Sequence, residues 1–179
     1  MKRTVLVFGL ISGLIVSVWM VASMAWFHYV ENCQGSMVLG YAGMLLAFSF
    51  VFVGVKSYRD KHNGGVISFG KAFQMGLYIS LIASTLYVIS WLVDYYVFIP
   101  DFMDKYGAQM LKQAQSSGAS AAELSKKAAE VASMKAMYKS PIMVVLYTYM
   151  EPFPVGLIVS LVTALVLKRK ATGGAAVMA

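Results

Sequence analysis

The sequence predicts an all-α, polytopic membrane protein: a bundle of four transmembrane helices with a long extracytoplasmic helical connector. Two observations support this fold class. The chain has 179 residues, of which 59% are hydrophobic and 13% charged, whereas soluble domains average about 25% charged residues. Four continuous apolar stretches also reach the roughly 20 residues that a helix needs to cross the hydrocarbon core. This composition excludes a disordered chain, a coiled coil and an ordinary soluble enzyme domain, and we expect one membrane domain over residues 1–179.

The predicted spans cover residues 4–27, 36–55, 72–99 and 141–167. The first two contain no charged residue, the third contains Asp94, and the last contains Glu151. Their apolar runs are continuous rather than alternating, which favours helices over the strands of a barrel. A cleaved signal peptide is the alternative for the first span. Its apolar run of about 20 residues is longer than the usual 7–15 of such a segment, so a permanent span is favoured.

Basic residues predict the orientation, because cytoplasmic connectors of membrane proteins are enriched in Lys and Arg. Nine of the fifteen basic residues precede the first span, lie in or beside the second connector, or follow the last span. These nine are Lys2, Arg3, Lys56, Arg59, Lys61, Lys71, Lys168, Arg169 and Lys170. Both termini are therefore expected in the cytoplasm. The net charge of +7 comes mostly from these cytoplasmic basic residues, and no nucleic-acid partner is expected. The expected partner of the basic connector is the lipid bilayer, whose anionic headgroups attract Lys and Arg.

Small residues spaced four apart predict close helix packing, since association inside lipid depends on close backbone approach. Such positions occur in every span. They are Gly9 and Gly13 in the first, Gly43 in the second, Gly76 in the third, and Gly156 and Ser160 in the last. Packing within one chain is favoured, and a homodimer or another membrane protein as partner remains the alternative.

The connector over residues 100–140 is expected to form two helices outside the cytoplasm. Pro100 ends the third span. Ser120 and Glu123 have the spacing of a capping box, which begins an amphipathic helix over about 121–139. A shorter helix covers about 101–115. We expect this hairpin to rest on the bundle or on the outer headgroups, with a docking surface or a gate as the alternative.

Catalytic and metal-binding motifs are nearly absent, so no enzyme, cofactor or metal is expected. His28 and His62 fall on opposite sides of the membrane in this topology, which excludes a histidine metal cluster. The stretch from Gly65 to Lys71 matches GxxxxGK, but Ala72 follows where a phosphate loop needs Ser or Thr, and a membrane helix precedes it. The only cysteine, Cys33, is expected to be an unpaired thiol, although it could pair with a second chain.

The intramembrane acids Asp94 and Glu151 are the leading site candidates, because an ionisable residue in a span is a functional hypothesis by default. Both fall in the outer part of the bilayer, near Tyr95, Tyr96, Tyr147 and Tyr149. Glu151 precedes two prolines, which disturb the helix. The hypothesis is an outward-facing pocket for a cation or proton. The favoured interpretation is that both acids lie in headgroup water beside an aromatic belt and the last span begins near Phe153.

The second connector carries candidate cytoplasmic contacts for a lipid headgroup or a partner. These candidates are Lys56, Arg59, Lys61 and Lys71. Ser68 is predicted to cap the third span. A tight connector with positive-inside anchors is the favoured interpretation, and a docking site is the alternative.

The chain resembles the small four-helix membrane family catalogued as domain of unknown function 4199. The similar stretches are GLISG at 9–13, KSYRDK at 56–61, Gly64 and Gly65, ISFGKAF at 67–73, Gly76 and Leu77, PDF at 100–102, and GLIVSL at 156–161. This resemblance implies a bacterial inner-membrane location and supplies no activity. We therefore expect a non-enzymatic accessory or assembly factor. The alternative is a small transporter or channel subunit that uses the region of Asp94 and Glu151.

Overall fold

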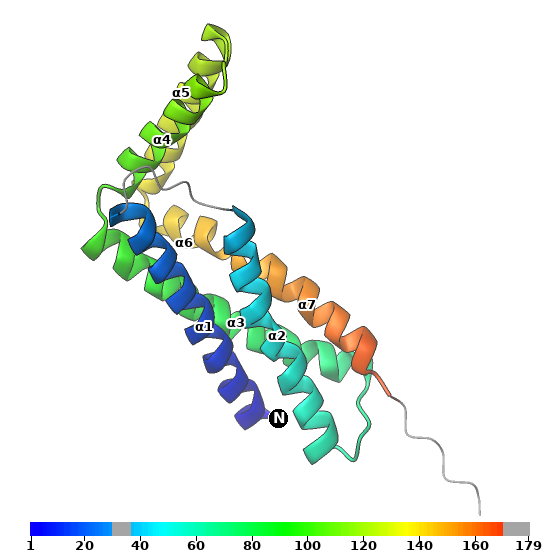
Figure 1. The fold of residues 1–179 in the computed structure, drawn as a ribbon. Coiled ribbons are helices and arrows are strands. Elements are labelled where there is room, and N and C mark those ends of the chain that lie inside the picture. Colours follow the sequence, from blue (N-terminus) through cyan, green and yellow to red (C-terminus); the bar gives the residue numbers. More distant parts are fainter. Residues whose placement is uncertain (30–36, 170–179) are drawn as a thin grey trace, which may run out of the picture.

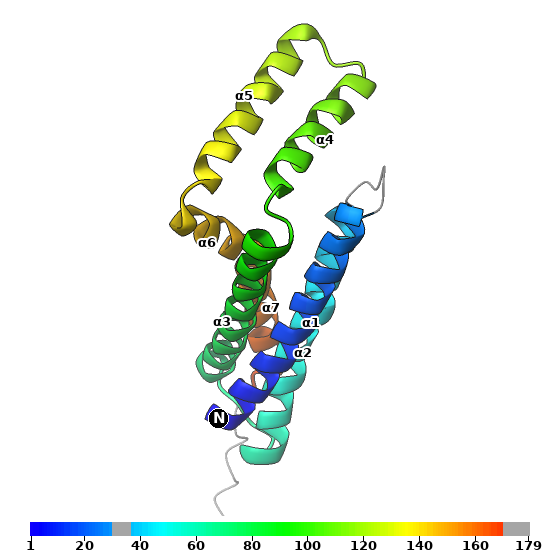
Figure 2. The ribbon, with the colours of Figure 1, turned by 90° about the vertical axis from the view of Figure 1, so that its left-hand side faces the viewer.

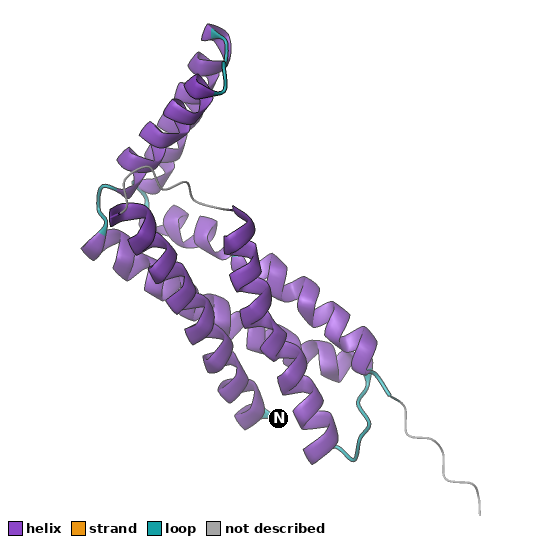
Figure 3. Cartoon of the chain, in the orientation of Figure 1, coloured by secondary structure: helices purple, strands orange, loops and turns teal. Residues whose placement is uncertain are grey.

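The computed structural model describes residues 1–29 and 37–169 of the chain, and Cys33 lies outside these residues. The described backbone is almost entirely helical (Figures 1 and 3). Its elements are α1 (Lys2–Tyr29), α2 (Met37–His62), α3 (Phe69–Val93), the π-helix η1 (Asp94–Phe98), α4 (Phe102–Ser116), α5 (Ala121–Tyr138), α6 (Pro141–Tyr149) and α7 (Pro152–Leu167). Four segments are long and apolar enough to cross a membrane, namely Lys2–Trp26, Val38–His62, Phe69–Phe98 and Pro141–Leu167. The predicted all-α class with four spans is confirmed.

Helix α3 lies at the centre of the packing between the spans. It packs against α1 on one side and α7 on another, while α2 packs against both α1 and α7 (Figures 1 and 2). Phe48, Met75 and Ile79 are fully enclosed where these helices meet. The large apolar side chains that remain exposed lie mostly on the four spanning segments. They would face lipid, which is as apolar as these side chains themselves.

The closest helix contact joins α3 and α7 through residues without bulky side chains. A Cβ atom on Gly156 would lie 2.7 Å from the Cβ of Ser80, and one on Gly76 would lie 2.8 Å from the Cβ of Ser160. The hydroxyls of Ser80 and Ser160 lie 3.1 Å apart, and both donate to the carbonyl oxygen of Gly156, at 3.1 and 2.7 Å. Polar side chains of this kind hold membrane helices together where apolar burial cannot.

The other predicted packing glycines also lie at contacts within the chain. Gly9 and Gly13 of α1 lie against α3, where an added Cβ would meet Ile82 and Leu86 at 2.8 and 2.5 Å. Gly43 of α2 lies against the indole of Trp19 in α1. Each of the six small residues therefore faces another helix of the same chain.

The largest differences from the predicted boundaries are at the end of the second span and at the start of the third. Helix α2 continues past residue 55 to His62, because its polar last turns can extend beyond the lipid. It stops before Gly64 and Gly65, which adopt positive φ angles of 61° and 77°. The third span begins at Phe69, and the predicted cap is confirmed: Ser68 accepts from the backbone N–H of Lys71 at 3.3 Å. Its far end is a π-helix rather than α-helix.

The fourth span is two helices rather than one. Helix α6 ends at Tyr149 and α7 begins at Pro152, so the break falls at Met150 and Glu151. Figure 2 shows α6 turned away from the direction of α7. Proline has no backbone N–H and favours the first turn of a helix, so Pro152 and Pro154 begin α7 instead of continuing α6.

Helices α4 and α5 form a hairpin that projects from the end of the bundle opposite the N-terminus (Figures 1 and 2). The two helices match the predicted ranges closely. The predicted capping box is present, with the Ser120 N–H donating to Glu123 Oε2 at 2.7 Å. Lys135 of α5 pairs with Asp104 of α4 at 2.6 Å. The hairpin meets the bundle at its base, because its two helices pack mainly against each other. Of the two expected resting places, the bundle receives only this base, and contact with the outer headgroups stays a prediction.

Candidate functional site

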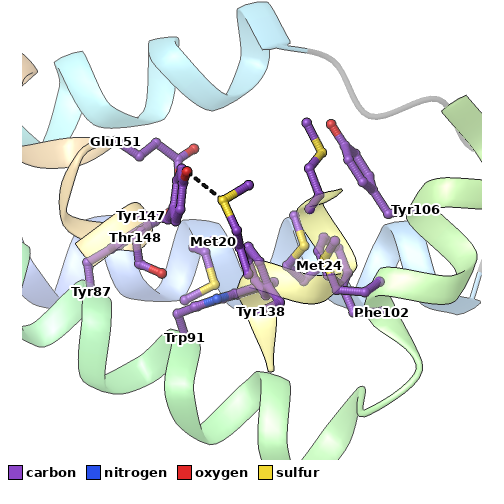
Figure 4. A pocket seen from close by; sticks show the side chains of 13 residues that line it. Met20, Met24, Tyr87, Trp91, Phe102, Tyr106, Tyr138, Tyr147, Thr148 and Glu151 are labelled. Atoms are coloured by element: carbon purple, nitrogen blue, oxygen red, sulfur yellow. Dashed lines mark hydrogen bonds between the residues drawn. The ribbon is translucent and has the colours of Figure 1, made fainter. Parts of the chain in front are cut away.

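A pocket of about 500 Å³ lies where the base of the hairpin meets the end of the bundle (Figure 4). Side chains from α1, α3, α4, α5 and α6 form its walls, together with the residue at the break before α7. The lining residues are Met20, Met24, Tyr87, Trp91, Phe102, Met103, Tyr106, Met134, Met137, Tyr138, Tyr147, Thr148 and Glu151. The size falls within the 300–1,000 Å³ of typical small-molecule sites.

Glu151 supplies the carboxylate of this pocket. Tyr87 is a buried residue with an exposed fraction of 5%. Its hydroxyl donates to Oε2 of Glu151 at 2.8 Å. Glu151 itself is exposed, because the helix break carries it out of the α3–α7 contact. An ionised carboxylate has about four acceptor positions. The Tyr87 bond therefore fixes one oxygen and leaves the group able to accept from a ligand.

Aromatic rings form much of the pocket wall. Trp91 packs edge-on against Phe102 with ring centres 4.9 Å apart, and Phe102 stacks on Tyr106 at 5.6 Å. Tyr138 stacks on Tyr147 at 6.5 Å. Figure 4 shows Glu151 and Tyr147 toward one end of the pocket and Tyr106 and Phe102 toward the other. A ligand along this axis would meet the carboxylate at one end and ring faces over the rest of its length.

Five methionines complete the lining: Met20 and Met24 from α1, Met103 from α4, and Met134 and Met137 from α5. The hydroxyl of Tyr147 donates to the sulfur of Met137 at 2.9 Å, which joins α6 to the hairpin. Methionine side chains are flexible and polarisable, so they adapt to ligands of different shape. The wall on the hairpin side can therefore adjust to an occupant.

Tyr138 at the base of the hairpin keeps its proton over the physiological range. Burial, and then the nearby Glu151 carboxylate, raise the pKa of Tyr138 to about 12. A neutral phenol remains a hydrogen-bond donor to a ligand or a water.

The structure brings together two of the predicted pocket residues and separates the others. Glu151 and Tyr147 both line the pocket, whereas Asp94, Tyr95 and Tyr149 do not. Asp94 is 7% exposed and belongs to η1. It lies seven residues beyond Tyr87, which is about 10 Å along a helix, so it is at a different depth from Glu151.

The remaining predicted tyrosines contact other groups. Tyr95 packs against the rings of Trp91 and Tyr138, behind the pocket wall. Tyr96 is exposed and packs edge-on against Tyr95. The hydroxyl of Tyr149 lies 2.7 Å from that of Thr85 on an exposed face. The hydroxyl that donates to Glu151 is that of Tyr87 instead.

Sequence reasoning missed the residue that holds the carboxylate, Tyr87, and most of the aromatic and methionine wall. Tyr87 lies inside a continuous apolar run, where a tyrosine facing lipid and one facing a neighbouring helix look the same. A signal was present in the spacing of Tyr87 and Trp91, which lie four apart and therefore on one helix face.

The basic candidates at the opposite end of the bundle separate into two pairs. Arg59 donates to the last carbonyl of α7, that of Leu167, at 3.5 Å, and pairs with Asp60 at 2.7 Å. Lys71 donates to Asn63 Oδ1 at 3.2 Å and lies 5.0 Å from the ring centre of Tyr58. Arg59 and Lys71 thus hold the connector together, while the side chains of Lys56 and Lys61 are exposed.

These features define an integral membrane protein of helical spans with a pocket at one end of the bundle. The chain belongs to the family described as "Protein of unknown function (DUF4199)", which matches it over residues 7–169. A search of curated proteins found no match, and a search of solved structures found none either.

Proposed function

We propose that this protein is a non-enzymatic accessory factor of the bacterial inner membrane that acts by holding a small ligand in the pocket between hairpin and bundle. The observation that carries the proposal is the pocket itself. Five helices and the break residue Glu151 converge on it, and its walls combine apolar surface with a few polar groups. Pockets of this composition are the usual form of a small-ligand site.

The distribution of basic residues supports an orientation for this site. Lys56, Lys61 and Lys168 are exposed, and they lie in the last turns of α2 or directly after α7. These helix ends are at the end of the bundle that also holds the N-terminus (Figure 1). Positively charged ends of membrane proteins stay in the cytoplasm. We therefore propose that both termini lie in the cytoplasm and that the hairpin with its pocket lies on the outer side.

A transporter or channel subunit is the second candidate function, and the break in the fourth span favours it. Broken helices with a polar group at the break line the substrate sites of many transporters. Glu151 occupies such a break, between Tyr149 and Pro152. Transport requires the pocket to open alternately to both sides, whereas an accessory binding function requires access from one side only.

The proposal is tested by trapping the occupant in intact cells. A photo-crosslinking amino acid, p-benzoylphenylalanine, replaces Tyr147 in the pocket wall. In the matched control it replaces Tyr78, an exposed tyrosine of α3 that does not line the pocket. After illumination, mass spectrometry of the purified protein is expected to show an adduct of one discrete small-molecule mass at position 147 and not at 78.

Two outcomes would contradict the proposal. The same bulk lipid adducts at both positions would show that the pocket is merely part of the lipid surface. An adduct of protein mass at position 147 would show that a partner chain, rather than a small ligand, occupies this place.

A further inference from the structure

We infer that the pocket selects an organic cation: a molecule with one positive charge, as an ammonium or alkylated ammonium group, on an apolar or aromatic body. This inference rests on the proposed function and names the class of ligand that the same site takes.

The charge of the pocket points to a monocation. Among the described residues that line it, Glu151 carries the only carboxylate, and no Lys, Arg or His is present. A carboxylate beside aromatic and apolar walls attracts a positive group and repels a negative one. An anionic ligand would meet repulsion and find no cationic side chain in the wall.

The aromatic wall points to an organic cation rather than a metal ion. Six aromatic residues line the pocket: Tyr87, Trp91, Phe102, Tyr106, Tyr138 and Tyr147. Ring faces attract alkylammonium groups within about 6 Å of the ring centre, and aromatic cages bind quaternary ammonium ligands in this way. Hard metal ions instead need six or more oxygen ligands, or several carboxylates, around a small cavity.

The shape of the pocket separates the two parts of such a ligand. Glu151 and Tyr147 lie toward one end, and Phe102 and Tyr106 lie toward the other (Figure 4). The charged head would lie beside Glu151, and the apolar body would extend toward Phe102. Tyr87 acts as a positioning residue, because its hydroxyl holds one carboxylate oxygen at 2.8 Å without itself carrying charge.

Charge-selective thiol labelling of the pocket tests this inference. Met134 of the pocket wall is replaced with Cys in a full-length chain that carries Cys33→Ser. The matched control is Ala132→Cys, an exposed position on the same helix that does not line the pocket. The three probes are methanethiosulfonates that carry an ethyltrimethylammonium, an ethylsulfonate or a neutral methyl group. Labelling rates are measured in reconstituted vesicles, each relative to the rate of the same probe at position 132.

The cationic probe is expected to label position 134 faster than the anionic probe by on the order of tenfold, after this correction. Glu151→Gln, which keeps the shape and an acceptor for Tyr87, should remove the preference. Asp94→Asn neutralises an acid outside the pocket and should leave it unchanged. Benzyltrimethylammonium should also slow neutral labelling of position 134, whereas its uncharged carbon analogue neopentylbenzene should not.

The outcomes separate the two proposals. Normal neutral labelling without any preference for the cationic probe would overturn the cation inference and leave the pocket as a site for another ligand. A cysteine at 134 that no probe labels, beside a reactive cysteine at 132, would show a closed pocket and overturn the proposed function as well. A charge preference that survives Glu151→Gln would show that the Glu151 carboxylate does not select the cation, and would overturn the inference.

Discussion

Gly156 shows how one missing side chain fixes the distance between two spans. Its Cα lies so close to α3 and α2 that an added methyl would meet Ser80 of α3 at 2.7 Å and the ring of Phe48 of α2 at 2.8 Å. Helical glycine is ordinarily a liability, since replacement by Ala stabilises a helix by about 1 kcal/mol. At Gly156 the steric overlap with α3 and α2 outweighs the gain in helix propensity.

We predict that Gly156→Ala destabilises the protein by about 1–3 kcal/mol, the usual range for overpacking. Gly40→Ala in α2 is the control, because an added methyl there meets no atom within 4 Å. It should be neutral or stabilising. The measurement is reversible unfolding in mixed detergent micelles with increasing dodecyl sulfate. Equal effects of the two substitutions would show that helix propensity alone governs both positions.

Residue-level features could be predicted where they depend on local spacing. The small-residue pattern pointed to Gly76, Gly156 and Ser160, and the structure places all three in one contact. The partner of Glu151 could not be predicted in this way. Tyr87 and Glu151 are 64 positions apart, and only the packing of α3 beside the break brings them together.

The start of helix α5 could be predicted from the sequence, because a capping box marks it. The Ser120 side chain accepts from the Glu123 N–H at 3.4 Å, and the Glu123 carboxylate accepts in return from the Ser120 N–H and hydroxyl. These bonds, led by the one from the backbone, lower the pKa of Glu123. Such reciprocal bonds satisfy donors that the first turn of a helix leaves open.

We predict that the start of α5 becomes less stable in acid. A carboxyl whose pKa is lowered in the folded state contributes stability above its unfolded pKa, and this contribution is lost as the pH falls through the folded value. Amide hydrogen exchange of the first turn of α5, corrected for the intrinsic pH dependence, should therefore show less protection at low pH. The amides in the middle of α5 serve as the internal reference.

Ser120→Ala provides the second arm of this experiment. Loss of an N-cap hydroxyl costs about 1 kcal/mol of helix stability, so the first turn of this variant should exchange roughly fivefold faster at neutral pH. Its exchange should also depend less on pH, because the reciprocal arrangement is broken. Protection that stays the same in both proteins at every pH would mean that packing against α4, and not the cap, holds this turn.

At the scale of elements, the sequence predicted what depends on local chemistry. Hydropathy located all four spans, and the caps at Ser68 and Ser120 located two helix starts. The π-helix over Asp94–Phe98 carries no such signal. The exact break at Glu151 also depends on where α6 can pack, although Pro152 and Pro154 indicated that the helix is disturbed there.

The whole molecule has two chemically different ends. The basic connector and the N-terminus lie at one end, and the hairpin lies at the other (Figure 1). The pocket lies at the base of this hairpin. The pocket itself needs five helices at once, so no window of sequence contains it. Each span is one continuous stretch of sequence and could therefore be predicted, whereas most residues of the pocket wall could not.

We predict opposite labelling of the two ends. Single cysteines replace Lys61 at the basic end and Ala119 at the tip of the hairpin, both with Cys33→Ser. A membrane-impermeant thiol reagent should label position 119 in right-side-out vesicles and position 61 in inside-out vesicles, because basic connectors remain in the cytoplasm. The reverse pattern would place the pocket in the cytoplasm and require a ligand from inside the cell.

The backbone bridge between Ile67 and Arg169 links the segment just before α3 to the second residue after α7. The N–H of each donates to the carbonyl of the other, at 3.1 and 2.9 Å. During synthesis, Ile67 leaves the ribosome about a hundred residues before Arg169 does. The backbone edge at Ile67 therefore lacks this partner until Arg169 has been synthesised. Packing of α7 against α3 is therefore a late step, and an intermediate that lacks α7 exposes the α3 surface at Gly76 and Ser80 to lipid.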